Sequence, residues 1–388
     1  YTRMESSAAS DVYKRQHVVR SLIARPGLVR VMSEVAVCGS FAHRIDSSAE
    51  SWRRANRYGR HMRIGSFGGS INDGTLDDVV AEARRAEADG FASYWIPNIF
   101  GHDALTALAI VGREVPRIEL GTSVVPTYPR HPSAIAQQCL TVNAACEGRL
   151  TLGIGLSHKI VIENMLGMSY DKPVRHIRDY LSILGPLSRN EPVSYRGEDY
   201  STNMAIQAKG APPFGIVVAA LGPQMLKATA ELADGTITWC TGPKTLESHV
   251  IPTINAAAEA AGRPAPRVIV GLPVCVTDDI DGARERAAKI FEIYGSLPSY
   301  RAMLDREGVA GPEGIAIVGT EEEVVDRIGA LADLGVTEFA GSEFGGNADE
   351  VGATRAAIKK AMSGPGCGVS STPGPSPRSS WITRRSTW

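Results

Sequence analysis

The segment 75–96 reads TLDDVVAEARRAEADGFASYWI and contains one complete unit of a helix followed by a strand. Thr75 and Asp78 have the spacing of a capping box, after which apolar residues recur at three- and four-residue steps. Gly90 ends this pattern, as glycine commonly does at the end of a helix. The short apolar run 91–96 that follows is typical of a buried strand, so the segment indicates an α/β fold.

The same unit recurs near the other end of the sequence. Thr320 and Glu323 have the capping spacing for a helix over 320–335, and the run 336–339 has the composition of the next strand. Similar helix-to-strand turns occur at 88–90, 233–235 and 333–335. Further strands are expected at 118–125, 150–154, 215–220, 236–240 and 268–276, and further helices near 103–113, 133–145, 223–233, 245–261, 279–293 and 348–361.

This repeating pattern predicts a (β/α)8 TIM barrel, a fold that typically takes about 250 residues before insertions. The alternative is a doubly wound sheet, which normally carries a G-x-G-x-x-G turn after its first strand, and residues 67–70 do not supply one. The interval 157–213, with a helix near 173–186 and a hairpin at 193–200, is predicted to be an insertion after strand four. In a barrel, such an insertion lies over the active-site face.

The two ends of the chain differ in composition from its centre. The 388 residues include 41 basic and 42 acidic side chains, but residues 1–61 hold 11 basic and 5 acidic ones, and residues 364–388 hold 3 basic and no acidic ones. We therefore expect one barrel domain over 62–363. It is preceded by a non-native or disordered N-terminal extension and followed by a disordered or out-of-frame tail.

The composition of the central region excludes several classes of function. Residues 62–363 carry 27 basic and 37 acidic side chains, which does not suit the wrapping of nucleic acid. No run reaches the roughly 18 apolar residues of a membrane span, so no membrane partner is expected. The six cysteines are scattered and lack metal-ligand spacing. Neither a metal site nor a disulfide framework is expected, and a cytoplasmic location is indicated.

Barrel enzymes carry their chemistry where strands end, so candidate site residues are sought there. After the second predicted strand, Asn98 and His102 are the candidate catalytic residues, because both could reach a ligand. The alternative is that Asp103 caps the next helix and His102 is merely exposed. Phe67 and Phe100 are candidates for lining the substrate pocket.

Two later strand ends are rich in small residues. Strand four ends in LGIGLS at 152–157 and strand five in AALGP at 219–223. Small residues let backbone N–H groups approach an anion, and Pro223 suits the first position of a helix whose N-terminus favours phosphate. No G-x-S-x-G, H-E-x-x-H or P-loop motif occurs in the sequence. These features favour a phosphate-bearing cofactor that performs the chemistry while the protein orients it.

Taken in order, these strand ends resemble those of the bacterial-luciferase-like superfamily and, within it, of the coenzyme F420-dependent oxidoreductases of actinobacteria. The resemblance covers about residues 62–345, and the succession of motifs is more specific than any one of them. It is carried by GTSV at 121–124, YPRHP at 128–132, RLTLGIG at 149–155, ALGP at 220–223 and ADG at 233–235.

The resemblance implies a barrel with an insertion after strand four that binds the deazaflavin F420 in its C-terminal mouth. It implies a non-proline cis peptide at Ser123–Val124, whose bulge backs the deazaflavin ring so that hydride transfers on one face. It also implies a homodimer that acts on a small-molecule substrate. The cofactor-binding residues that it implies are Asn98, Ser123, Val124, Gly153, Gly155, Leu156, Ala220, Leu221 and Gly222.

One departure from the family pattern affects the expected reaction. Family members that oxidise a sugar phosphate carry a histidine one position after the equivalent of Asn98, and this chain has Ile99 there. Sugar-phosphate dehydrogenation is therefore not expected. A reductase that takes hydride from reduced F420 needs mainly orientation and a proton source, which His102 or solvent could supply.

The leading hypothesis is an F420-dependent oxidoreductase that transfers a hydride between the deazaflavin and a small organic substrate. An FMN-dependent monooxygenase of the same superfamily is the first alternative, because backbone turns bind both cofactors. The second alternative is an F420-binding protein without turnover. Lys159, Arg175 and Arg178 are candidates for meeting the acidic tail of F420, the alternative being that they are solvated helix and loop charges.

Overall fold

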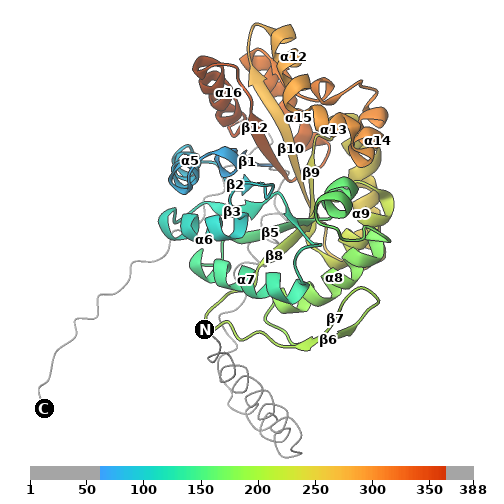
Figure 1. The fold of residues 1–388 in the computed structure, drawn as a ribbon. Helices are drawn as coiled ribbons and strands as arrows, with labels where there is room; N and C mark the ends of the chain where they lie inside the picture. The colour runs from blue at the N-terminus through green and yellow to red at the C-terminus, as the bar shows by residue number, and fades with distance from the viewer. Residues whose placement is uncertain (1–61, 364–388) are drawn as a thin grey trace, which may run out of the picture. The chain divides into compact units, whose positions relative to one another are not determined.

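Eight parallel strands form a closed barrel in the computed structural model, which describes residues 62–363 (Figure 1). The barrel is closed because β1 pairs with both β2 and β12, and β9 pairs with both β8 and β10. Both edges of the sheet are paired, so the TIM barrel is confirmed and the doubly wound alternative is excluded. Its strands are β1 (Arg63–Phe67), β2 (Ser93–Ile96), β3 (Glu119–Thr122), β5 (Leu150–Gly155), β8 (Gly215–Val218), β9 (Gly235–Trp239), β10 (Arg267–Val276) and β12 (Glu338–Glu343).

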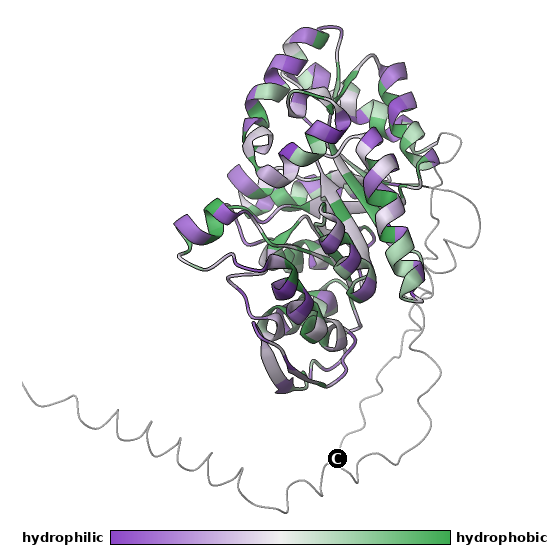
Figure 2. Cartoon of the chain, turned by 90° about the vertical axis from the view of Figure 1, so that its right-hand side faces the viewer, coloured by the Kyte–Doolittle hydropathy of each residue, from purple (hydrophilic) through white to green (hydrophobic). Residues whose placement is uncertain are grey.

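Helices between successive strands surround the barrel and turn their apolar faces toward it (Figures 1 and 2). Both expected capping boxes are present, because Thr75 caps α5 with Asp78 and Thr320 caps α15 with Glu323. The ring consists of α5 (Leu76–Ala88), α6 (Ala104–Glu114), α7 (Pro132–Ala145), α8 (Pro173–Ser188), α9 (Pro223–Leu232), α11 (Ile251–Ala260), α15 (Glu321–Asp333) and α16 (Ala348–Ala361).

Smaller elements lie between the strands and the ring helices. The expected strand 118–125 is present as β3 and the short β4, separated by residues 123–124. The helices α13 and α14 and the strand β11 were not expected from the sequence. The smaller elements are α4 (Ser70–Asp73), β4 (Val125–Pro126), η1 (Val161–Met165), β6 (Val193–Arg196), β7 (Ser201–Met204), α10 (Pro243–Thr245), η2 (Leu246–Val250), α12 (Ile280–Ile290), α13 (Glu292–Ser296), α14 (Pro298–Glu307), η3 (Pro312–Gly314) and β11 (Ile317–Gly319).

The segment between β5 and β8 differs from the single covering insertion expected at 157–213. Helix α8 packs between α7 and α9, so it is one of the eight ring helices and supplies the crossover that parallel strands require. The hairpin β6–β7 is held against α8, since Asp179 accepts hydrogen bonds from the Tyr195 hydroxyl at 2.6 Å and from Asp199 N at 2.8 Å. Only residues 156–172, between the end of β5 and the start of α8, are therefore left as an insertion at the C-terminal end of the barrel.

The barrel interior is filled by side chains of alternating strand residues. An apolar cluster occupies its middle and is joined by the half-buried Phe67 and Val124 at the C-terminal end. At the N-terminal end, ion pairs join Arg63 and Arg267 to Glu119 and Glu338. The apolar cluster consists of Trp95, Val217, Ile237, Ile269 and Ala340.

The predictions for 1–61 and 364–388 concern residues outside the described part of the chain. Within 62–363, no helix has the length and apolar content needed to cross a membrane. The cysteines of this region, Cys139, Cys146, Cys240 and Cys275, are buried and free.

Candidate functional site

The chain bends sharply between β3 and β4 at the C-terminal mouth of the barrel. The peptide bond between Ser123 and Val124 is cis, at the position that the resemblance implied. Thr122 ties this segment to β5, because its hydroxyl donates to Gly153 O at 2.7 Å and accepts from Gly153 N at 2.9 Å. The Val124 side chain joins the interior cluster and so lies in the mouth.

The two glycines of β5 allow this close approach. A Cβ atom on Gly153 would lie 1.9 Å from Thr122 O, and one on Gly155 would lie 2.6 Å from Val124 Cγ2. Atoms at such distances overlap, so a side chain at Gly153 would require a shift of the Thr122 backbone and one at Gly155 a shift of the Val124 side chain. The Gly-x-Gly pattern therefore has a packing role against the 122–124 segment, in addition to the anion-binding role expected from the sequence.

The second small-residue turn leads into α9. Ala220 is buried, and the Leu221 carbonyl lies 2.8 Å from Nε2 of His249, which holds the turn in place. Gly222 is the exposed N-cap residue of α9, and no side chain caps this helix end. A Cβ on Gly222 would meet no atom within 4 Å, so the space beside the first N–H groups of α9 is open. An uncapped helix N-terminus of this kind suits a phosphate group.

An aromatic wall lies on the other side of the mouth. The rings of Phe67 and Trp239 are 5.1 Å apart, and Trp239 also contacts Phe291 at 5.8 Å and Tyr294 at 6.1 Å. The Nε1 atom of Trp239 is buried and lacks a well-aligned acceptor in the described structure. The indole N–H still lies close enough to the Tyr294 hydroxyl to offset part of the rise in its pKa that burial causes. A buried donor without an acceptor at a strand end is a candidate ligand contact.

Trp239 was not among the residues expected from the sequence. The signal that could have found it is its position as the last residue of β9, two residues after the inward-facing Ile237. Alternate residues of a strand share a face, so Trp239 had to point into the mouth.

The candidate site residues that follow β2 differ in how far they are exposed. Asn98 is half-buried, and its Oδ1 accepts a hydrogen bond from Ala104 N at 3.0 Å, which leaves its Nδ2 group as a donor. His102 is exposed, with Nε2 3.1 Å from Gly74 O. Asp103 caps α6, as the alternative interpretation held. Phe100 is 71% exposed, so the ring projects from the loop rather than into the packed interior.

Buried aromatic residues hold the bent segment and the chain after β5 together. The Tyr128 ring stacks on His176 of α8 at 3.9 Å and on Tyr170 at 5.3 Å. Thr127 Oγ1 lies 2.9 Å from His176 Nε2. Burial lowers the pKa of His176 to about 4, so the imidazole is neutral near pH 7 and serves as packing and hydrogen-bonding support.

These features place two glycine-bearing strand ends and an aromatic wall around one barrel mouth. Residues 57–338 match the family described as luciferase-like monooxygenase, which is more than half of the chain. The chain belongs to this family. Its position within the family is described by its similarity to individual members.

Two curated relatives are named for related chemistry. The chain is 29% identical over 298 residues to a 5,10-methylenetetrahydromethanopterin reductase of Archaeoglobus fulgidus, which covers 68% of this chain and 88% of that protein. It is 30% identical over 190 residues to a putative coenzyme F420-dependent oxidoreductase of Mycobacterium tuberculosis, which covers 45% of this chain and 53% of that protein.

Solved structures show the same fold at lower identity. The F420-dependent tetrahydromethanopterin reductase of Methanopyrus kandleri superposes with a TM-score of 0.65 at 22% identity and covers 78% of this chain and 97% of that chain. An F420-dependent secondary alcohol dehydrogenase superposes with a TM-score of 0.66 at 19% identity and covers 78% and 98% of the two chains.

The three cationic side chains predicted as candidates for binding the acidic tail of F420 all form ion pairs with carboxylates in this luciferase-like chain. Lys159 lies 3.7 Å from Glu163, Arg175 lies 2.6 Å from Asp199, and Arg178 lies 2.6 Å from Glu231. These pairs agree with the alternative that the three side chains are surface charges. Among residues 62–363, no group of three or more histidine, cysteine or carboxylate side chains is arranged to hold a metal ion.

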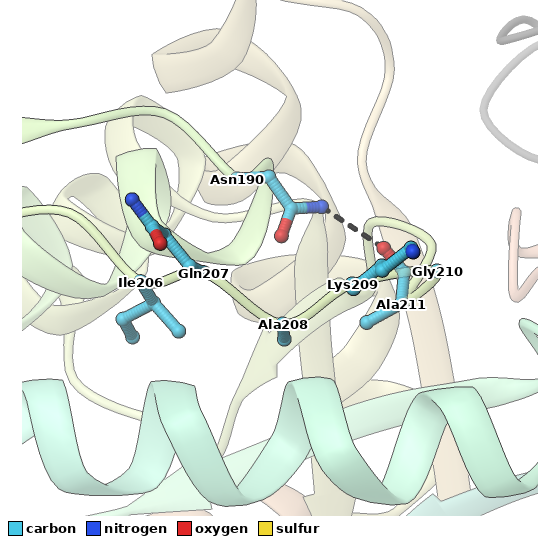
Figure 3. A pocket seen from close by; sticks show the side chains of 7 residues that line it. All are labelled: Asn190, Ile206, Gln207, Ala208, Lys209, Gly210 and Ala211. Carbon is cyan, nitrogen blue, oxygen red and sulfur yellow. Dashed lines mark hydrogen bonds between the residues drawn. The ribbon is translucent and has the colours of Figure 1, made fainter. Parts of the chain in front are cut away.

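A surface depression of about 430 Å³ lies away from the mouth, between Asn190 and the loop 206–211 (Figure 3). Asn190 Nδ2 donates to Ala211 O at 3.1 Å across it. Asn190 follows the end of α8, and the loop precedes β8, so this depression lies at the N-terminal end of the strands. Enzymes with this barrel carry out their chemistry at the opposite end, so the depression is not the candidate site.

Proposed function

We propose that the chain is an oxidoreductase that uses coenzyme F420 to transfer a hydride to or from a small organic substrate. The observation that carries this proposal is the uncapped N-terminus of α9 at Gly222, open beside the same mouth as the bent Ser123–Val124 segment. The name of one curated relative supports F420 over FMN, since that protein is described as a putative coenzyme F420-dependent oxidoreductase.

In this proposal the residues of the mouth bind and orient the cofactor. The N–H groups at the start of α9 hold its phosphate, and the backbone of Gly155, Leu156 and Ala220 at the two strand ends lies close to its chain. Ser123 and Val124 support one face of the ring, and Asn98 Nδ2 remains available to donate a hydrogen bond. The bound deazaflavin supplies the hydride chemistry.

The remaining task of the protein is to exclude water and to supply a proton. Phe67 and Trp239 form an apolar wall that limits access of water to the mouth. The proton source is His102 or solvent, because His102 is exposed at the strand end that also carries Asn98. We also propose that the active form is a homodimer, which sedimentation of the purified chain tests.

An FMN-dependent monooxygenase is the second candidate. A solved structure of the same fold is described as an oxygenating constituent of a Baeyer–Villiger monooxygenase in complex with FMN, and it superposes with a TM-score of 0.60 at 17% identity. A helix N-terminus holds the phosphate of either cofactor, so the geometry of α9 alone does not separate them.

Titration of the purified chain with F420 and with FMN, followed by fluorescence, separates the candidates. We expect stoichiometric binding of F420 and oxidation of its reduced form by members of a panel of carbonyl and alkene acceptors. Tight FMN binding with oxygen consumption would establish the monooxygenase instead. Stoichiometric F420 binding without oxidation by any acceptor would indicate a binding protein without turnover.

The variant Gly222→Asp tests where the phosphate binds. Aspartate is a favourable N-cap residue, and Gly222 has an extended backbone (φ −76°, ψ 150°), so α9 should keep or gain stability. Its carboxylate would repel the phosphate, and we expect F420 affinity to fall about tenfold or more. The matched control is Gly222→Asn, which has nearly the same shape without the charge. Equal affinities for the two variants would exclude α9 as the phosphate site.

A further inference from the structure

Large apolar side chains are exposed in the two segments that follow β2 and β5. Of the twelve large apolar residues that are most exposed in the described chain, six lie in these two segments. They are Ile99 and Phe100 after β2, and Ile160, Met165, Leu166 and Met168 after β5, with exposed fractions from 37% to 71%. Both segments follow strands at the same end of the barrel, and the four apolar side chains clustered in sequence at 160–168 are the kind of exposed surface that binds something apolar.

The segment after β5 is anchored on two sides of the mouth. Near its C-terminal end, Tyr170 stacks on Tyr128, which follows β4, and donates a hydrogen bond to Ser157 O at 3.3 Å. Near its start, the His158 ring lies 5.9 Å from Tyr300 of α14. The four exposed apolar residues lie between these anchors in the sequence. The stretch 160–168, which includes the single turn of π-helix η1, therefore connects the β4 side of the mouth with the α14 side.

The exposed stretch is continuous with the aromatic wall of the mouth. The Tyr300 ring lies 5.0 Å from that of Tyr294, and the Tyr294 ring lies 6.1 Å from that of Trp239, which in turn contacts Phe67 at 5.1 Å. A chain of ring contacts thus runs from His158 to the interior cluster of the barrel. Burial lowers the pKa of His158, so this ring adds no positive charge at neutral pH.

The charges on the same stretch neutralise one another. Lys159 and Glu163 form an ion pair one helical turn apart, and no other charged residue lies between His158 and Met168. Nearby, Arg130 is paired with Asp103, and Arg301 of α14 is paired with Asp305 at 2.8 Å. The stretch 158–168 itself therefore offers no unpaired cation to a substrate, whereas Lys172 beyond it and Arg306 of α14 are exposed and form no ion pair in the described structure.

We infer that the substrate has an extended, uncharged apolar portion, which residues 160–168 and Phe100 hold at the barrel mouth. This inference rests on the proposed function, because it assigns a substrate class to the same site. The apolar portion lies against Met165, Leu166 and Met168, and the reacting carbon lies deeper, beside the Phe67–Trp239 wall.

A homologous series of primary alcohols with four to ten carbons probes this surface. Binding is measured by calorimetry to the full chain, with and without F420, and F420 binding is measured separately by fluorescence. We expect affinity to rise about threefold to fourfold for each added methylene group. In the variant Met165→Gln/Met168→Gln the increment should fall toward zero, while F420 binding stays unchanged.

Met204→Gln is the matched control, because Met204 is 37% exposed on β7 of the hairpin and lies outside the stretch after β5. It should keep the full increment for each methylene. Affinity that does not depend on chain length, or an increment that survives in the double variant, would overturn the inference. A double variant that dissociates a dimer without changing alcohol binding would also overturn it, because the surface would then be a contact between copies. Loss of F420 binding in the unaltered chain would instead contradict the proposed function.

Discussion

The two ends of the barrel interior are built from opposite kinds of side chain. At the N-terminal end, two arginines and two glutamates pair with one another, and Trp95 Nε1 donates to Glu338 at 2.7 Å. At the C-terminal end, Phe67, Val124 and Trp239 are apolar or aromatic, and the indole N–H of Trp239 has no well-aligned partner. A satisfied polar network stabilises one arrangement, whereas an unsatisfied donor is available to a ligand. The contrast matches the division of barrels into a stability end and an active-site end.

Both carboxylates of the N-terminal network are multiply bonded, with Glu338 buried and Glu119 half-buried. Glu338 is 1% exposed and accepts hydrogen bonds from Arg267, Trp95 and Ser93. Burial by itself raises the pKa of Glu119, but the charges of Arg267 and Arg63 outweigh it and hold the pKa well below its usual range. Glu119 therefore stays ionised at neutral pH, and removing one member of the network leaves a charge without its partner.

The largest effect on stability is expected for Glu338→Gln. Both arginines lose a buried counter-charge, which typically costs about 3–5 kcal/mol of unfolding free energy. Urea denaturation measures the loss, and the F420 affinity of the folded protein should not change. The matched control is Glu114→Gln, because Glu114 pairs with Arg84 where both side chains are exposed, and this change should cost less than about 1 kcal/mol. Equal losses in the two variants would mean that the network contributes no special stability.

His176 is expected to make stability depend on pH near the mouth. Its pKa is about 4 in the folded protein against an ordinary value of 6.5, so the unfolded chain binds more protons between these values. Stability is therefore lost as pH falls from about 6.5 to about 4, by up to about 3 kcal/mol. In His176→Gln this part of the pH dependence should disappear, while a hydrogen bond to Thr127 can still form. Parallel pH profiles of unfolding free energy for the two proteins would contradict the expectation.

Substitution of a glycine at the barrel mouth is expected to have an intermediate effect on the unfolding free energy. In Gly153→Ala the new methyl group would overlap Thr122 O, so we expect a loss of about 1–3 kcal/mol together with weaker F420 binding. The control is Gly329→Ala in α15, where a Cβ meets no atom within 4 Å and alanine should stabilise the helix by up to about 1 kcal/mol. Thermal unfolding of both variants checks the opposite signs. Similar values would show that the contact with Thr122 relaxes at little cost.

The elements that the sequence predicted best are those set by local signals. The capping boxes at Thr75 and Thr320 act within one helical turn, so the starts of α5 and α15 could be read directly. Helix α8 was expected as part of a covering insertion, because nothing in its own sequence distinguishes a ring helix from an inserted one. Its packing between α7 and α9 depends on residues far away in the chain.

The N-terminal network could have been predicted from a pattern of charged residues in the sequence that the prediction did not use. Arg63, Glu119, Arg267 and Glu338 are the first residues of β1, β3, β10 and β12. A charge of either sign at the start of four buried strands indicates pairing at the shared end of the barrel. The pairing itself joins residues as far apart as 63 and 338, so it required the closed sheet. At the mouth, the strand ends were located correctly, but Trp239 was missed because no site residue was predicted at the end of the strand 236–240.

The smallest stability effect is expected for Trp239→Phe at the C-terminal end of the barrel. The same substitution at Trp95, near the N-terminal network, gives a direct comparison of the two ends. Trp239→Phe removes an indole N–H that has no well-aligned partner, so on that account the unfolding free energy should change by less than about 1 kcal/mol, before any loss of packing. Trp95→Phe removes a donor to the buried Glu338 carboxylate and should cost about 1.5–3 kcal/mol on that account, before any loss of packing. Binding should show the reverse order, with Trp239→Phe weakening F420 or substrate binding and Trp95→Phe leaving it unchanged in the folded protein. If Trp239→Phe lowered stability as much as Trp95→Phe and left binding intact, the mouth would be a second structural layer of the barrel, and the candidate site would have to lie above it.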